Sequence, residues 1–245
     1  MKLLRTIRQN LIMKNQNGNY YKYAVGEIIL VVLGILIALS INNWNENRKN
    51  KKKELVLINN IIEDLGLDLI HINKSLNEVV NQKELVDDLI EKIIDNKKKL
   101  DYEKIGLLRF SSDFRPISQR NHSESISNLN DDFIRDILQK YFLKEDQVLD
   151  IFLEYVDIIH NKIRPYLSET GMHNLKSLYD NKTNEKLHVP LHPKILEKQL
   201  SVLKFQQLLY ERRLKTDSFE KLLRELRLRN EELVIKLKNE IDRFK

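Results

Sequence analysis

One apolar stretch, with polar sequence on both sides, constrains this chain more than any other feature. Residues 28–41 carry no charge, and only one glycine and one serine interrupt the alanine and the large apolar side chains there. A helix rises about 1.5 Å per residue and the hydrocarbon core of a bilayer is about 30 Å thick, so a span also needs the flanking residues. We therefore predict a single transmembrane helix over residues 23–44.

The surroundings of this stretch support a membrane span but leave two alternatives. Tyrosines before it and Trp44 after it form the aromatic belt that is expected at membrane interfaces. A buried core helix would need a surrounding fold, whereas the neighbouring sequence is strongly polar. A cleaved signal peptide is the stronger alternative, because Ala38 and Ser40 have the spacing of a cleavage site, although the preceding segment is unusually long.

Composition favours long helices and excludes several chemistries. The 245 residues include only 6 Gly and 4 Pro, so chain-breaking residues are rare for this length. The absence of Cys removes disulfides, thiolate metal sites and cysteine nucleophiles. Most of the net charge of +6 lies in residues 1–50, and the rest of the chain is nearly neutral. We expect no nucleic-acid binding, because that function needs a basic face on the folded domain.

Residues 1–22 are predicted to form a basic amphipathic segment. Five apolar side chains share one helical face there, apart from the arginines: Leu3, Leu4, Ile7, Leu11 and Ile12. This pattern is typical of a helix that lies on anionic lipid. Basic residues on the two sides of the span nearly balance, but holding this helix against the inner leaflet favours a cytoplasmic N-terminus. We therefore expect the remaining chain to lie in the periplasm.

Residues 45–245 are predicted to form an elongated all-helical domain that begins with a long helix over residues 54–95. Apolar residues recur there at steps of three and four: Leu55, Ile58, Ile62, Leu65, Leu69, Ile72, Leu76, Val79, Val86, Ile90 and Ile93. Such a heptad seam is typical of coiled-coil-like helices and of helical bundles. The seam predicts long-helix packing without indicating a function.

Shorter helices are predicted over residues 100–170. Asn130 or Asp131 would cap one of them. Its apolar side chains face one way: Phe133, Ile134, Ile137, Leu138, Tyr141 and Phe142. Pro165 is expected to end or kink the helix that follows.

Long C-terminal helices are predicted over residues 193–245. The first has an apolar face that comprises Ile195, Leu196, Leu200, Leu203, Leu208 and Tyr210. Asp217 and Glu220 resemble a capping box, which predicts a break near Thr216. A second seam follows, in which Asn230 would fix the register: Leu223, Leu226, Leu233, Leu237 and Phe244. We expect the first and last long helices to pair antiparallel, with the middle helices alongside.

The apolar stretch and its polar flank carry a recognisable signature at residues 26–52, GEIILVVLGILIALSINNWNENRKNKK. This run resembles the signature of an uncharacterised family of single-pass membrane proteins from flavobacteria and related bacteria. In that family a long helix, a Ser/Asn-rich turn with a short helix, and a closing coiled-coil-like helix follow, and this chain is similar along its length. Family members usually have Gln in place of Ser40. The resemblance implies an anchored helical domain of unknown function and supplies no catalytic or binding residues.

Candidate catalytic and metal-binding residues are few. His188 and His192 would share one face of a helix, but two prolines make this an extended loop, and no Cys completes a zinc site. Adjacent carboxylates do not face each other on a helix: Asp87 with Asp88, and Asp131 with Asp132. The sequence contains no phosphate-binding glycine loop, nucleophile elbow or zinc-protease motif. We therefore expect no enzymatic activity, cofactor, bound metal or small-molecule substrate.

Two hypotheses of function follow. Gly34 and Ala38 form a small-xxx-small pair through which two anchors would approach closely, although small residues are also common in membrane helices. We predict a scaffold or interaction protein in the inner membrane, which contacts the bilayer and, through its helical seams, a protein partner or a second copy. The alternative is a ligand-sensing helical bundle. Such a bundle would signal through a separate partner protein, because the N-terminal side is too short for an output domain.

Overall fold

The computed structural model of the protein describes residues 17–179 and 190–243, most of them in helices. The amphipathic segment predicted within residues 1–22 falls largely outside the described residues, as does His188. The chain divides into two units, residues 1–56 and residues 57–245.

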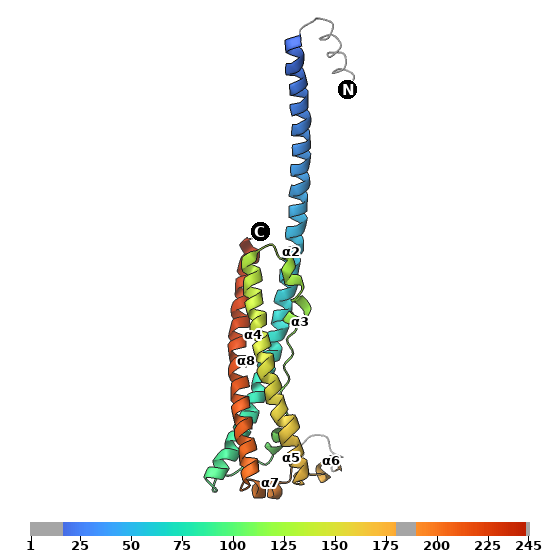
Figure 1. The fold of residues 1–245 in the computed structure, drawn as a ribbon. Helices are drawn as coiled ribbons and strands as arrows, with labels where there is room; N and C mark the ends of the chain where they lie inside the picture. The colour runs from blue at the N-terminus through green and yellow to red at the C-terminus, as the bar shows by residue number, and fades with distance from the viewer. Residues whose placement is uncertain (1–16, 180–189, 244–245) are drawn as a thin grey trace. The chain divides into compact units, whose positions relative to one another are not determined.

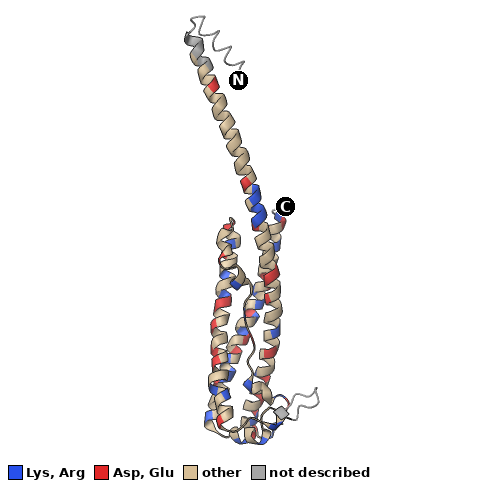
Figure 2. Ribbon diagram, turned by 90° about the vertical axis from the view of Figure 1, so that its right-hand side faces the viewer, with Lys and Arg blue, Asp and Glu red and all other residues tan. Residues whose placement is uncertain are grey.

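The N-terminal unit contains the first part of α2 (Asn17–Ile94), which carries the candidate membrane span. Figure 2 shows this stretch of α2 as nearly uncharged, with Lys and Arg gathered just beyond it. The large apolar side chains from Val25 to Trp44 are exposed. A helix that is apolar on every side needs either a protein core or lipid around it. Because none of the span is buried, its exposure argues against the core-helix alternative and is what a lipid-facing segment requires.

Three long helices form the second unit, which confirms the predicted all-helical bundle. The second part of α2, α4 (Asp132–Asp157) and α8 (Leu203–Arg243) lie side by side in Figure 1. Asn230 of α8 reaches Leu65 of α2, whereas Asp217 reaches Lys83, so α2 and α8 run antiparallel as predicted. α4 makes the same antiparallel pairing with α8, so α2 and α4 run parallel to each other.

The core of this unit comprises two apolar clusters. The larger contains four aromatic side chains whose ring centres lie 5.0 to 6.4 Å apart in the contacting pairs: Phe114, Phe152, Tyr155 and Phe219. The smaller surrounds Tyr166, which stacks on Phe205 with ring centres 5.3 Å apart. Burying one such side chain contributes about 1.5–3 kcal/mol, so both clusters hold the long helices together.

A connecting segment runs back along the bundle. It is needed because α2 and α4 are parallel, so the end of α2 and the start of α4 lie at opposite ends of the bundle. The segment comprises η1 (Ile105–Arg109), α3 (Ser118–His122) and η2 (Ser125–Asn128). Its contacts with α2 occur in reverse order. Ser112 donates to Glu78 at 3.0 Å, and the backbone N–H of Ile117 donates to Asp68 at 2.7 Å. The returning segment therefore packs antiparallel along α2.

The start of α4 confirms one prediction, and its end differs from another. Asp131 caps α4 by accepting hydrogen bonds from the backbone N–H groups of Phe133 and Ile134. The helix does not end at Pro165, because α4 continues into a π-helix, η3 (Ile158–Ile163), and then into α5 (Arg164–Glu169). Pro165 is the second residue of α5 and directly follows η3, where the helical hydrogen-bond pattern changes.

The chain beyond α5 closes one end of the bundle (Figure 1). It contains α6 (Lys176–Tyr179), α7 (Pro193–Gln199) and an isolated antiparallel bridge between His173 and Leu191. Met172 and Leu191 are buried in the smaller apolar cluster. The bridge therefore joins two segments that flank the undescribed residues 180–189.

The structure corrects two predictions for α8. Residues 203–243 form one continuous helix, so there is no break near Thr216. Asp217 and Glu220 do not cap a helix and instead bind Lys83 of α2. The predicted core residues Leu203 and Tyr210 are exposed. In a continuous helix the buried seam takes a different set at steps of three and four: Phe205, Leu209, Arg212, Thr216 and Phe219.

Asn230 is a fully buried polar residue in the seam of α8. Its Nδ2 donates to the backbone oxygen of Leu65 in α2 at 3.0 Å and to the hydroxyl of Tyr141 in α4 at 2.9 Å. Sliding α8 along either neighbour would leave these groups unpaired. Asn230 therefore sets the register of all three helices, which is the role predicted for it.

Replacing Asn230 with Ala should lower the free energy of unfolding by about 2–4 kcal/mol, through two lost hydrogen bonds and a cavity. Asn239 is exposed on the same helix, so Asn239→Ala should change stability by less than about 0.5 kcal/mol. Denaturant titration of the full chain in detergent micelles measures both values. Equal effects of the two substitutions would contradict the role of Asn230.

Candidate functional site

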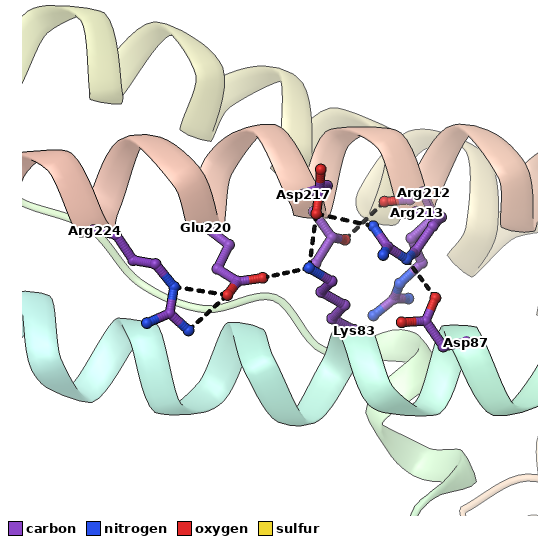
Figure 3. Close-up of polar contacts among 8 residues, drawn as sticks. Lys83, Asp87, Arg212, Arg213, Asp217, Glu220 and Arg224 are labelled. Carbon is purple, nitrogen blue, oxygen red and sulfur yellow. Dashed lines mark hydrogen bonds and ion pairs between the residues drawn. The ribbon is translucent and has the colours of Figure 1, made fainter.

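Charged side chains join α2 to α8 along one face of the bundle (Figure 3). The Nζ atom of Lys83 lies 2.7 Å from Oδ1 of Asp217 and 2.8 Å from Oε2 of Glu220. Arg224 lies one turn along α8 and binds the other oxygen of Glu220 at 2.7 Å. Lys83 therefore bridges two helices through two carboxylates.

A second ion pair extends this face. Arg213 of α8 binds Asp87 of α2, and it also lies 3.1 Å from Asp217. Asp217 thus accepts from both Lys83 and Arg213, and the two ion pairs form one network. Because each member contacts a charge of opposite sign, the network fastens α2 to α8.

Each charge in this network is stabilised by its partners. Hydrogen bonds with Asp217 and then Glu220 raise the pKa of Lys83, and the bond with Lys83 lowers the pKa of Asp217. Burial alone would raise the pKa of Glu220, but Lys83 and Arg224 outweigh burial and lower that pKa. Carboxylates that are paired in this way are poor general bases, so the arrangement serves structure better than catalysis.

Arg212 lies next to this network but points into the core (Figure 3). Its side chain is fully buried and donates to the backbone oxygens of Leu107 at 2.9 Å, of Phe110 at 3.3 Å and of Leu108. Burial lowers the pKa of Arg212 to about 10. Backbone oxygens of the connecting segment, rather than a carboxylate, therefore hold this cation.

Sequence analysis missed Arg212, although a signal was present. Steps of three and four taken backward from Phe219 reach Thr216, Arg212 and Leu209, which are all buried. The capping-box interpretation of Asp217 ended the seam too early. A continuous seam would have placed this arginine inside the bundle.

Glu145 of α4 is a second buried ionisable group. It has no exposed surface, and the Ser118 hydroxyl of α3 donates to its Oε1 at 3.3 Å. Burial, and then the negative charge of Asp68, raise the pKa of Glu145 to about 8. Its carboxyl group therefore retains a proton at neutral pH.

The adjacent carboxylates that the sequence singled out have separate structural partners. Asp87 binds Arg213, Asp88 binds Lys98, Asp131 caps α4, and Asp132 binds Arg135. No two of them converge on one point where a substrate would sit. The residues that the structure describes also contain no group of three or more His, Asp or Glu side chains that could hold a metal ion.

The remaining predicted residues lie apart from these groups. His192 precedes α7, and its backbone N–H donates to the oxygen of Met172 at 2.8 Å. A Cβ added to Gly34 would meet nothing within 4 Å, so no contact within one copy requires glycine there. The association of anchors through Gly34 and Ala38 stays a prediction.

The outward face of α8 carries a line of apolar side chains, here called the α8 stripe. Its members are roughly half exposed: Leu203, Tyr210, Leu214, Leu228 and Ile235. A shallow groove of about 390 Å³ runs beside Leu228, lined also by Lys83, Asp217, Glu220, Lys221, Arg224 and Glu225. This surface combines apolar side chains with charges of both signs.

Comparison with protein families gives a match to part of the chain. Residues 27–115 match a family that is described as a family of unknown function, DUF6090. The matched region contains most of the candidate span, the bundle part of α2 and the first part of the connecting segment. This match fits an uncharacterised domain. A search of the curated proteins found no match, and a search of the solved structures found none either.

We predict that the ion pairs of the Lys83 network contribute more to the free energy of unfolding than an exposed ion pair within one helix does. Lys83→Met should lower the free energy of unfolding by about 1–3 kcal/mol, because the mostly buried Glu220 loses one of its two charged partners. Lys140→Met removes an exposed pair with Asp136 within α4 and should cost less than about 0.5 kcal/mol. Denaturant titration compares the two variants. A Lys83→Met loss no larger than that of the control would contradict a fastening role.

Glu145 predicts a pH dependence of stability. Its pKa is about 8 when folded, above the unfolded value, so its contribution is full below about pH 4.5 and is lost as pH rises toward 8. Glu145→Gln imitates the protonated acid and should exceed the wild type in stability by about 2–4 kcal/mol near pH 9, with little difference near pH 4.5. Glu154→Gln, on the same helix, should lack this pH dependence. Parallel stability curves for Glu145→Gln and the wild type would contradict a buried, protonated carboxyl group.

Proposed function

We propose that this chain is a membrane-tethered helical interaction protein. One retained anchor would hold it in the inner membrane, with the bundle on the periplasmic side. The exposed apolar span of α2 and the all-helical second unit support this proposal. The ion pairs between α2 and α8 also support it, because their charged groups already have structural partners.

The α8 stripe is the observation that carries the proposal. Leu214, Leu228 and Ile235 recur at multiples of seven residues on the outward face, and each is about half exposed. Seven-residue spacing brings side chains to one line on a helix, as in helix–helix contacts. The inner seam of α8 is already filled by the bundle, so this second line is available to another helix.

A second copy of the chain is the occupant that we assign to the α8 stripe. Lys221, Glu225 and Glu232 share its face by spacing, so both charge signs lie beside the apolar side chains. A surface with both signs is suited to a two-fold contact with itself. Copies that are tethered to one membrane also share a plane, and their raised effective concentration lets a small contact suffice.

Cysteine crosslinking in native membranes tests this proposal, because the chain contains no Cys. Ser218→Cys, beside the stripe, should form a linked dimer on mild oxidation, and adding Leu214→Lys with Leu228→Lys should remove most of it. Asp150→Cys, exposed on α4, is the matched control. The thiol at position 218 should also react with a membrane-impermeant maleimide from the periplasmic side.

Two outcomes would contradict this assignment. In the first, Ser218→Cys links no better than Asp150→Cys, or the lysine substitutions leave its linking unchanged. In the second, only Gly34→Ile removes the dimer, which would assign association to the anchor rather than to the bundle. Labelling of position 218 from the cytoplasmic side alone would overturn the periplasmic placement.

Ligand sensing is a second candidate function, and one observation favours it. Basic side chains gather at one end of the bundle without a carboxylate partner among the described residues. Charges that are not balanced within a protein are common where a charged ligand binds.

A further inference from the structure

Basic side chains from five segments meet near the end of the bundle where α8 begins. This basic cluster comprises Arg109 of η1, His160 of η3, Arg164 of α5, His173, and the buried Arg212 of α8. The Nε atom of Arg164 donates to the backbone oxygen of Arg109 at 2.8 Å. His160 lies 3.2 Å from the hydroxyl of Ser111. The connecting segment thus brings together residues that are far apart in the sequence.

The members of the basic cluster repel one another. Burial, and then the charge of Arg109, lower the pKa of Arg164 and of His173. Burial, and then the charge of Arg164, lower the pKa of His160. Both histidines are therefore neutral at neutral pH, and each can donate one N–H hydrogen bond.

No carboxylate among the described residues forms an ion pair with the arginines of this cluster. Several arginines elsewhere do have such partners: Arg115, Arg135, Arg213, Arg224 and Arg243. Backbone oxygens hold Arg212 and Arg164 instead, as at a helix C-terminus. The backbone carbonyl dipoles orient the Arg212 and Arg164 side chains but do not cancel their positive charge.

Three buried side-chain nitrogens in the cluster have no hydrogen-bond partner within the described residues. They are Nε of Arg109, Nε2 of His173 and Nε of Arg212. The guanidinium of Arg109 lies 5.6 Å from the ring centre of Phe110. A buried donor without a partner lowers the stability of a fold, so a fold gains little by keeping these three groups unless something else binds them.

The local backbone is also unusual. His160 lies within η3, a π-helix, whereas the helix before it and the helix after it are regular. Single π-helical turns are rare in proteins, and those that occur are often found at functional sites. The inserted turn sets which side chain of this helix faces Ser111 and Arg164.

We propose that Arg109, Arg164, His160 and His173 bind a tetrahedral oxyanion of the phosphate class. Guanidinium groups present planar forks that match phosphate oxygens, and two arginines balance a dianion. His173 adds one uncharged donor. The Ser111–His160 pair adds one more, because the hydrogen bond between them uses the other donor of the pair. Donors from several segments suit a tetrahedral anion better than a planar carboxylate, and Arg212 supports the site from within the core.

Other chemistry fits this place less well. Ser111 and His160 resemble part of a nucleophile–base pair, but no described carboxylate accepts a hydrogen bond from His160 to orient it. Uncompensated arginines also repel metal cations. The oxyanion site deepens the ligand-sensing candidate and is independent of the α8 stripe, because the two surfaces share no residue.

Calorimetric titration of the full chain in detergent micelles with inorganic phosphate, at constant ionic strength in chloride, tests the site. The wild type should bind saturably, and Arg109→Gln should bind about tenfold or more weakly, because a charge-assisted pair is lost. Arg115→Gln removes the same charge from an exposed position on the connecting segment and should bind like the wild type. A parallel titration with glycerol 3-phosphate separates a free oxyanion from a phosphomonoester.

Stability gives a second readout that a merely structural arginine would not produce. Without phosphate, Arg109→Gln should melt at a higher temperature than the wild type, because the charge repulsion between Arg109 and Arg164 is relieved. Arg109→Lys keeps the charge without the fork and should bind phosphate more weakly than the wild type. Absence of saturable binding, or equal binding by Arg109→Gln, would overturn the site. Either result leaves the crosslinking test of the α8 stripe unaffected.

Discussion

The carboxylate of Asp68 holds the segment on which the whole bundle depends. Because α2 and α4 run parallel, the chain must return along the bundle before α4 can begin. Asp68 accepts hydrogen bonds from the backbone N–H groups of Ile117 at 2.7 Å and Ser118 at 2.9 Å. Further along, the N–H of Ser112 donates to the hydroxyl of Tyr155 at 3.0 Å. A non-helical segment packed against helices is tolerable only when its backbone groups find such partners.

Charge is arranged differently at different places in this unit. Lys83, Asp217 and Glu220 neutralise one another across α2 and α8, and Asn230 forms neutral hydrogen bonds between three helices. Where α8 begins, the arginines have no acid partner in the described part of the chain. Proteins retain locally unfavourable groups chiefly at functional sites, where binding compensates for the loss of stability. The balanced charges of the Lys83 network therefore indicate a structural role, whereas the unbalanced arginines near the start of α8 indicate a candidate binding site.

The α2 seam shows how far pattern alone predicts a core. Ile58, Leu65, Ile72, Val79 and Val86 belong to the predicted seam, and all are buried. Between these positions the predicted seam residues Ile62 and Leu69 are only partly buried, whereas a second line of α2 that contains Asp68 is buried. Ser75 and Gln82 continue that second line. The apolar pattern could not predict polar residues there, because they are buried as partners of the returning segment and of Tyr155.

The sequence by itself determined the apolar span, the all-helical class, the antiparallel pairing of the first and last long helices, the Asp131 cap and the register role of Asn230. These features depend on hydrophobic periodicity and local capping, which act between residues close in the chain. Only the tertiary structure decided that α8 is continuous, that Asp217 and Glu220 bind Lys83, and that Arg109, Arg164 and Arg212 share one region. The Lys83 pairing and the gathering of the three arginines depend on residues more than fifty positions apart, which a local pattern does not relate to one another.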